Sequence, residues 1–156
     1  MAQPLTTHPA RTPTFGELTQ EVAGYAPPVG RVLLSAIFLS AGAMKLLDWN
    51  HTADLMASKG LPLVPLLLPL AALTELIAGL SLLLGWHARL GALALFLFLI
   101  PTTLVFHNFW AVTGPEQQNQ MQHFLKNLAI MGGLLVVVGL GPGRCSLDAA
   151  ERNTRG

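Results

Sequence analysis

Four long apolar segments restrict the fold of this chain more than any other feature. They run over residues 29–47, 61–84, 88–106 and 124–140, and a helix that crosses a bilayer needs about 20 mainly apolar residues. Charged residues make up only 11% of the chain, whereas a soluble domain usually carries about 25%. Too little charge remains to cover a surface in water. The sequence therefore predicts an all-α protein, a membrane-integral four-helix bundle in contact with the lipid bilayer.

The segment before the first apolar run has the pattern of a helix on the membrane surface. Thr14 and Glu17 have the spacing of a capping box, and apolar residues then follow at helical spacing. Pro27 and Pro28 separate this segment from the first spanning helix, because proline disrupts a helix interior. Residues 1–28 are therefore expected to be a cytoplasmic N-terminal segment with an amphipathic interfacial helix.

Two further segments complete the expected domain organisation. Residues 49–59, which Gly60 follows as a helix C-cap, are expected to form a short interfacial helix on the opposite side. Residues 149–156 are polar and are expected to be a disordered tail. The four-transmembrane-helix domain is then expected to cover residues 29–148, with no separate soluble domain.

Basic residues near the helix ends favour one orientation. They concentrate on the cytoplasmic side of a membrane protein, and the side that holds both termini carries six arginines against three lysines on the other side. These residues are Arg11, Arg31, Arg89, Arg144, Arg152 and Arg155 against Lys45, Lys59 and Lys126. We therefore expect a multi-pass membrane protein with both termini in the cytoplasm.

Ionisable residues inside the spanning segments are the first candidates for chemistry, because they are costly in lipid and usually face the bundle interior. Lys45 shares a helical face with Gly42, and Glu75 shares one with Gly79. Small residues on these faces are typical of close helix packing in membranes. We therefore expect both charged side chains to point inward.

A pair between Lys45 and Glu75 is the arrangement that the helix geometry favours. Counted along the helices at about 1.5 Å per residue, Lys45 and Lys126 are level with each other and about one turn above Glu75. The pair is expected to be shared with Lys126 and Asn127. One interpretation is an ion pair that only holds the bundle together. The other is a polar pocket in which a lysine binds an anionic or carbonyl-bearing ligand and Glu75 relays a proton.

Two histidines lie at the expected outer ends of the third and fourth helices. His107 and Asn108 close the third helix, and His123 begins the fourth. They can be interfacial polar residues, or ligands for haem or copper together with a methionine. A third interpretation, a quinone headgroup held by His107 and Lys45, needs only hydrogen bonds and an apolar slot. We assign no metal site. The candidate ligand-binding residues are Lys45, Glu75, His107, Asn108, His123, Lys126 and Asn127.

The expected cytoplasmic end of the bundle carries a second polar group, for which we expect a structural role. We expect Asp148 to pair with Arg89 or Arg31 beneath the helices. The members of this inner-face network are Arg31, Arg89, Arg144, Ser146 and Asp148.

Charge and cysteine usage exclude several classes of protein. The net charge of +1 and the lack of a basic stripe argue against nucleic acid as a partner. Cys145 is the single cysteine, which excludes an internal disulfide, a CxxC redox pair and a cysteine-rich zinc site within one chain.

These motifs together resemble the DoxX family of small bacterial membrane proteins. The matching residues are Phe38-Leu39-Ser40-Ala41-Gly42-Ala43-Met44-Lys45, Glu75, Gly79, Gly85, Arg89, His107-Asn108-Phe109-Trp110, Phe124-Leu125-Lys126-Asn127 and Gly143-Arg144-Cys145-Ser146-Leu147-Asp148. The likeness covers residues 29–148. It implies a four-helix bundle in the bacterial inner (plasma) membrane, and it implies links to quinone-dependent sulfur oxidation, to thiol and oxidative stress, or to assembly of other membrane proteins.

Two functions of different classes follow. The first is a component of a quinone- or thiol-linked redox system, an oxidoreductase subunit that holds a lipophilic carrier such as a quinone in a polar intramembrane pocket. The second is a non-catalytic scaffold or assembly factor. Gly132 and Gly133 offer a close-packing surface, so we expect a membrane-protein partner or a homo-oligomer.

Overall fold

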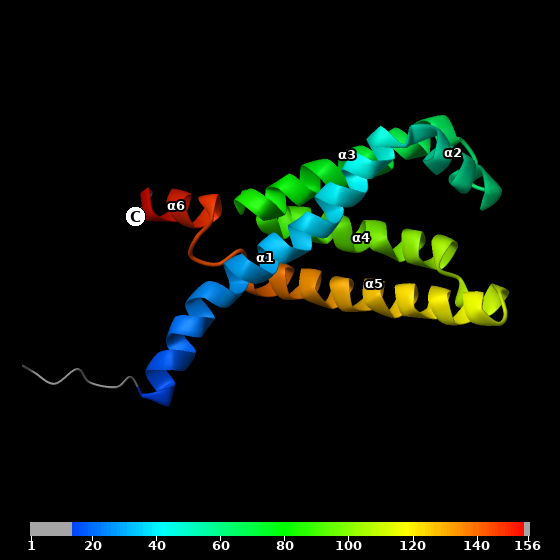
Figure 1. Cartoon of the computed structure of the whole chain (residues 1–156). Coiled ribbons are helices and arrows are strands. Elements are labelled where there is room, and N and C mark those ends of the chain that lie inside the picture. Colours follow the sequence, from blue (N-terminus) through cyan, green and yellow to red (C-terminus); the bar gives the residue numbers. More distant parts are fainter. Residues whose placement is uncertain (1–13, 155–156) are drawn as a thin grey trace, which may run out of the picture.

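The structure is a computed structural model that describes residues 14–154, and within this range it contains helices and no strand (Figure 1). Residues 1–13, including Arg11, and residues 155–156, including Arg155, lie outside the described residues, so the expectations that rest on them stay predictions. The elements are α1 (Phe15–Leu47), α2 (Trp49–Ser58), α3 (Val64–Leu84), α4 (Ala88–Phe106), the 3-10 helix η1 (Phe109–Ala111), α5 (Pro115–Leu140) and α6 (Leu147–Thr154).

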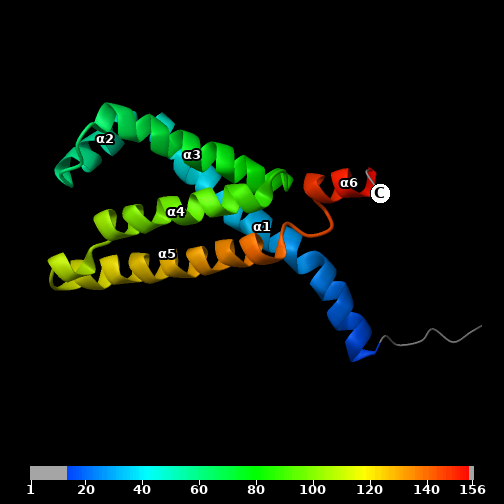
Figure 2. The same ribbon diagram turned by 180° about the vertical axis from the view of Figure 1, so that it is seen from behind.

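The expected all-α membrane bundle is confirmed. Within the described residues, α1, α3, α4 with η1, and α5 are long and apolar enough to cross a membrane. α1 packs on α3, α3 on α4 and α4 on α5, and α5 also contacts α1. Both views show α4 and α5 side by side along their length, whereas α3 moves away from α4 toward the end where α2 lies (Figures 1 and 2).

A small apolar core holds the four long helices together. Its residues come from α1, α3, α4 and α5, and the large apolar side chains outside it are mostly exposed, as expected where lipid rather than water surrounds a bundle. The core residues are Phe38, Ala78, Leu82, Ala92, Leu95, Leu99, Ile130, Leu134 and Val137.

Glycines set the close approach of α1 and α3. A Cβ atom on Gly42 would lie 2.8 Å from Leu76 Cγ and 3.2 Å from the Ala72 carbonyl oxygen, and one on Gly79 would lie 3.1 Å from Leu39. Both glycines therefore face the partner helix, as the small-residue pattern predicts. This packing brings the last turn of α1 against the middle of α3.

α1 differs from the prediction, because it continues through Pro27 and Pro28 as one helix. The capping box of Thr14 and Glu17 forms as expected and starts the helix. The break expected at the prolines is wrong: both proline rings pack against Gly143, where an added Cβ would meet Pro27 at 2.8 Å and Pro28 at 3.0 Å. The fixed φ of proline, about −65°, is compatible with a helix, and Gly143 lacks a side chain, so the rings pack closely on its backbone. The N-terminal part of α1 projects beyond the other helices (Figure 1).

The tail also differs from the prediction. Residues 149–154, expected to be disordered, belong to the helix α6. Ser146 explains this difference, because its Oγ accepts a hydrogen bond from the Ala149 backbone N–H at 3.2 Å, as an N-cap residue does. The short helix expected over residues 49–59 is present as α2.

The turn between α3 and α4 is closed from beneath by residues 141–148, and we call this the closed end of the bundle. Gly85 caps α3 with φ of 66°, and its carbonyl accepts the Asp148 N–H at 2.9 Å. An added Cβ at Gly85 would collide with the Arg31 guanidinium and with Ser146. The other end, with α2, η1 and the start of α5, we call the open end.

Gly85→Ala is expected to destabilise the protein much more than Gly60→Ala. Gly60 also has positive φ, 74° against 66°, so both changes carry about 1–2 kcal/mol of left-handed backbone strain. Nothing lies within 4 Å of a Cβ at Gly60, whereas overpacking at Gly85 adds about 1–3 kcal/mol. Thermal unfolding in mild detergent should therefore give a melting temperature several degrees lower for Gly85→Ala. Equal melting temperatures would contradict the tight packing of the closed end.

Candidate functional site

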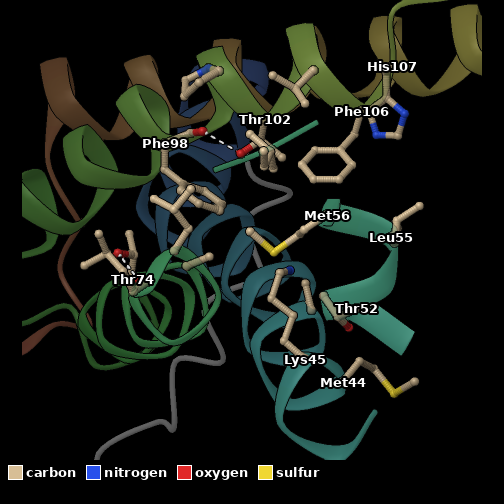
Figure 3. A pocket seen from close by; sticks show the side chains of 17 residues that line it. Met44, Lys45, Thr52, Leu55, Met56, Thr74, Phe98, Thr102, Phe106 and His107 are labelled. Carbon is tan, nitrogen blue, oxygen red and sulfur yellow. Dashed lines mark hydrogen bonds between the residues drawn. The ribbon is translucent and has the colours of Figure 1, made fainter. Parts of the chain in front are cut away.

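A cavity of about 680 Å³ lies between α1, α2, α3 and α4 toward the open end. This volume is within the range of small-molecule sites, about 300–1,000 Å³. Its wall is mainly apolar and includes Leu55, Met56, Leu67, Phe98, Val105 and Phe106. Its polar side chains are Lys45, Thr52, Thr74, Thr102 and His107 (Figure 3).

Lys45 reaches the cavity from the last turn of α1 and pairs with Glu75 of α3. Its Nζ lies 2.9 Å from Glu75 Oε1 and 2.7 Å from Oε2, so the expected contact is confirmed. The Glu75 side chain is 6% exposed and the Lys45 side chain 23% exposed. Glu75 is not part of the cavity wall, and Lys45 connects it to the cavity. No other ion pair forms among residues 14–154.

His107 enters the cavity wall from the end of α4. Its Nδ1 lies 2.9 Å from Gln120 Oε1, and Gln120 Nε2 donates to Glu116 Oε1 at 2.6 Å. Glu116 and Gln120 are site residues that the sequence reasoning missed. Their spacing of four places them on one face of α5, which was the available signal, but nothing in the sequence showed that this face meets His107.

His123 stacks on His107 outside the cavity wall. The ring centroids are 5.0 Å apart and the ring planes differ by 17°. Lys126 lies beside His123, with 3.0 Å between Nζ and Nδ1. The two histidines are therefore neighbours, and only one of them lines the cavity.

The expected sharing of Glu75 with Lys126 and Asn127 is wrong. Lys126 contacts His123 instead, and Asn127 Nδ2 donates to Thr103 Oγ1 at 3.0 Å within the α4–α5 interface. Lys126 therefore contacts a residue of its own helix, and Asn127 faces α4 rather than Glu75 of α3. Asn108 precedes η1, and its carbonyl accepts the Ala111 N–H at 2.9 Å.

The described part of the chain contains no cluster of the usual metal-binding side chains. No three His, Cys, Asp or Glu residues of that part lie close enough together to hold a metal ion. The stacked pair of His107 and His123 presents ring faces to each other, whereas ligands of one metal must point nitrogen atoms at it.

The closed end holds the inner-face residues in a network of backbone contacts. Arg31 Nη2 donates to the Cys145 carbonyl at 2.7 Å, and Arg89 Nη1 donates to the Val138 carbonyl at 2.9 Å. Ser146 Oγ donates to the Gly143 carbonyl at 2.7 Å. Arg144 is exposed. These contacts hold residues 141–148 against the helix ends.

The expected pairing of Asp148 with an arginine is wrong. Its Oδ1 accepts the His87 N–H at 2.7 Å and its Oδ2 accepts the Ala88 N–H at 3.1 Å. A carboxylate at a helix N-terminus satisfies N–H groups that have no partner within the helix. Asp148 therefore caps α4.

Comparison with known proteins finds one matching family model and relatives that are inner membrane proteins. The DoxX family model matches residues 26–108, a range that contains every residue of the cavity wall. The chain is 31% identical over 120 residues to inner membrane protein YphA of Escherichia coli (strain K12), which covers 77% of this chain and 86% of that protein. It is 36% identical over 120 residues to inner membrane protein YqjF of the same organism, and the match covers 77% of this chain and 87% of that protein.

A more distant relative is longer than this chain. The Surfeit locus protein 4 homolog of Drosophila melanogaster is 27% identical over 145 residues, which is 92% of this chain and 46% of that protein. No solved structure matches this chain.

Lys45→Met is expected to lower the free energy of unfolding by about 3–5 kcal/mol, because it leaves the buried Glu75 carboxylate without its partner. The double variant Lys45→Met/Glu75→Leu should recover most of that loss, since no buried charge remains. Lys59→Met, at an exposed lysine, is the control and should change little. Unfolding in mixed detergent micelles measures all three. A double variant as unstable as Lys45→Met would contradict a direct coupling of the two charges.

Proposed function

We propose that this chain, which belongs to the DoxX family, holds a lipophilic ring carrier of the quinone class in the cavity between α1 and α4. The protein is a small inner-membrane protein of that family. In this proposal it is a component of a quinone-linked redox system. The observation that carries the proposal is a cavity whose apolar wall contains Lys45 and His107.

The chemistry of the wall suits a quinone headgroup. Phe98 and Phe106 offer aromatic surface to a flat ring, and the remaining wall is mainly aliphatic. The cavity is partly open, which leaves room for an aliphatic tail to reach the lipid. Ligand sites typically combine such apolar walls with a few polar groups that fix orientation.

Lys45 and Glu75 have complementary tasks in this proposal. The Lys45 ammonium carries three N–H donors, and with Glu75 on one side it can still donate to a ring oxygen. Glu75 balances the charge of Lys45 and is the candidate proton relay, because a proton held at Nζ has the carboxylate as its next acceptor at 2.7 Å. A bound quinone supplies the capacity to take up two electrons and two protons. The Lys45–Glu75 pair would hold one such proton near the ring.

His107→Phe is expected to weaken binding of the hydroquinone form of a short-tailed ubiquinone analogue about tenfold, since it removes one hydrogen-bonding group. His51→Phe, at an exposed histidine of α2 outside the cavity wall, is the matched control and should leave the affinity unchanged. Titration of the purified protein in nanodiscs measures both. Extraction of the wild type should also yield a bound ring compound. Absence of binding in the wild type would refute the proposal.

The second candidate function is a non-catalytic scaffold or assembly factor, and one observation favours it. Gly132 and Gly139 on α5 have nothing within 4 Å of an added Cβ, so another membrane helix can approach closely there. Gly133 differs, because Leu34 of α1 occupies its face at 3.3 Å. A membrane protein that co-purifies in stoichiometric amount, with no ring compound, would favour this function over the redox one.

We further propose that both termini lie in the cytoplasm, so that the closed end faces inward and the cavity lies toward the outer leaflet. The arginines of the closed end against the lysines of the other end support this orientation.

Cys145 offers a direct test of orientation, because it is the single cysteine and is exposed at the closed end. A membrane-impermeant maleimide should label Cys145 only after the inner membrane is permeabilised. The variant Cys145→Ser/Gln118→Cys moves the thiol to the exposed start of α5, and it should be labelled in intact spheroplasts. The reverse pattern would place the termini outside.

A further inference from the structure

The polar side chains of the cavity wall differ in whether they can donate or accept a hydrogen bond, and this difference specifies the ligand further. We propose that the cavity selects a ring that donates a hydrogen bond to His107, which for the quinone class is the reduced hydroquinone form, and that Gln120 and Glu116 set this preference through His107. This inference rests on the proposed function and names the form of the carrier that binds.

Each of the three threonines in the wall donates its single hydroxyl hydrogen to a backbone carbonyl of its own helix or of Asp48, the residue before α2. Thr52 Oγ1 donates to the Asp48 carbonyl at 3.0 Å, Thr74 Oγ1 to the Leu70 carbonyl at 2.8 Å, and Thr102 Oγ1 to the Phe98 carbonyl at 2.8 Å. Figure 3 shows the bond of Thr102 within the wall. A hydroxyl has one donor and two acceptor lone pairs. Toward the cavity these side chains can therefore only accept.

The orientation of Gln120 determines which nitrogen of His107 carries the proton. Gln120 Nε2 points to the Glu116 carboxylate at 2.6 Å, and a carboxylate can only accept. The amide oxygen of Gln120 therefore faces His107 Nδ1 at 2.9 Å. Because this oxygen is an acceptor, Nδ1 must be the protonated nitrogen.

His107 Nε2 is then the free acceptor of the neutral ring. Gln120 belongs to α5, which contributes no residue to the cavity wall, so the nitrogen it binds is the one turned away from the cavity. Stacking on His123 at 5.0 Å further fixes the plane of the ring. Nε2 is therefore left to meet a ligand, and it lacks a proton.

Lys45 is the exception, because an ammonium can only donate. The cavity thus offers a donor at Lys45 and acceptors at His107 and the three threonines. A quinone has carbonyl oxygens that only accept, so its second oxygen would face the lone pair of Nε2. A hydroquinone hydroxyl accepts from Lys45 at one end of the ring, and the other hydroxyl donates to His107. The reduced ring satisfies both sites.

Gln120 and Glu116 are positioning residues in this arrangement, and ¹⁵N NMR of histidine-labelled protein tests them without any ligand. The wild type should show His107, assigned by comparison with His107→Phe, protonated at Nδ1 above the pH at which the ring is charged. Gln120→Leu should release the ring to populate the Nε2–H form. Gln118→Leu, an exposed glutamine on the same helix, should leave the wild-type signal unchanged. A wild-type His107 protonated at Nε2 would overturn the inference.

Binding of the two ring forms is the second test. Nanodisc titrations with the reduced and the oxidised short-tailed ubiquinone analogue should give about tenfold tighter binding of the reduced form to the wild type. Gln118→Leu should keep this preference and Gln120→Leu should lose most of it. Gln120→Lys donates to Nδ1 and should reverse the preference toward the oxidised form.

The outcomes separate this inference from the proposed function. If both forms bind the wild type equally, or if the preference survives in both Gln120 variants, the inference fails and the quinone site stands. If neither form binds, the proposed function fails and the inference fails with it.

Discussion

Lipid offers no hydrogen bonds, so polar groups in the spanning helices depend on partners within the protein. The contact of Lys45 with Glu75, at 2.7 Å, is the strongest consequence of that constraint. It connects the end of α1 to the middle of α3, and the close approach at Gly42 makes this reach possible. The same requirement explains the buried bond between Asn127 and Thr103. The Lys45–Glu75 contact thus favours one alignment of α1 along α3. Lys45 also lines the cavity, so the cavity lies next to this contact.

The two ends of the bundle differ because their polar groups serve different purposes. At the closed end, Arg31 and Asp148 bind backbone carbonyl and N–H groups and hold residues 141–148 beneath the helix ends. At the open end, α3 and α4 separate, and Lys45 and His107 face the space between them. At the closed end, the hydrogen bonds that form hold residues 141–148 in place, although Arg31 Nε and Nη1 are buried without a partner among the described residues. At the open end, Lys45 and His107 keep hydrogen-bonding capacity for a ligand.

The helices were largely predictable, because length and hydropathy of a spanning segment are local properties. α4 has the bounds that the sequence predicts, and Thr14 and Glu17 form the expected capping box. The two departures differ in kind. Pro27 and Pro28 pack against Gly143 from the other end of the chain, a contact that the local pattern does not show. The cap that Ser146 provides for α6 joins residues three apart, so a serine at this helix start was a local signal that the sequence reasoning missed.

The sequence by itself determined where the long apolar helices lie and which residues share a helical face, since helical periodicity and rise follow from residue order alone. Only the tertiary structure decided that Lys45 meets Glu75, that Asn127 turns to Thr103, and that Gln120 reaches His107. The physical reason is helix rotation: depth in the membrane is set by counting residues, but the direction of a side chain depends on how neighbouring helices pack against each other.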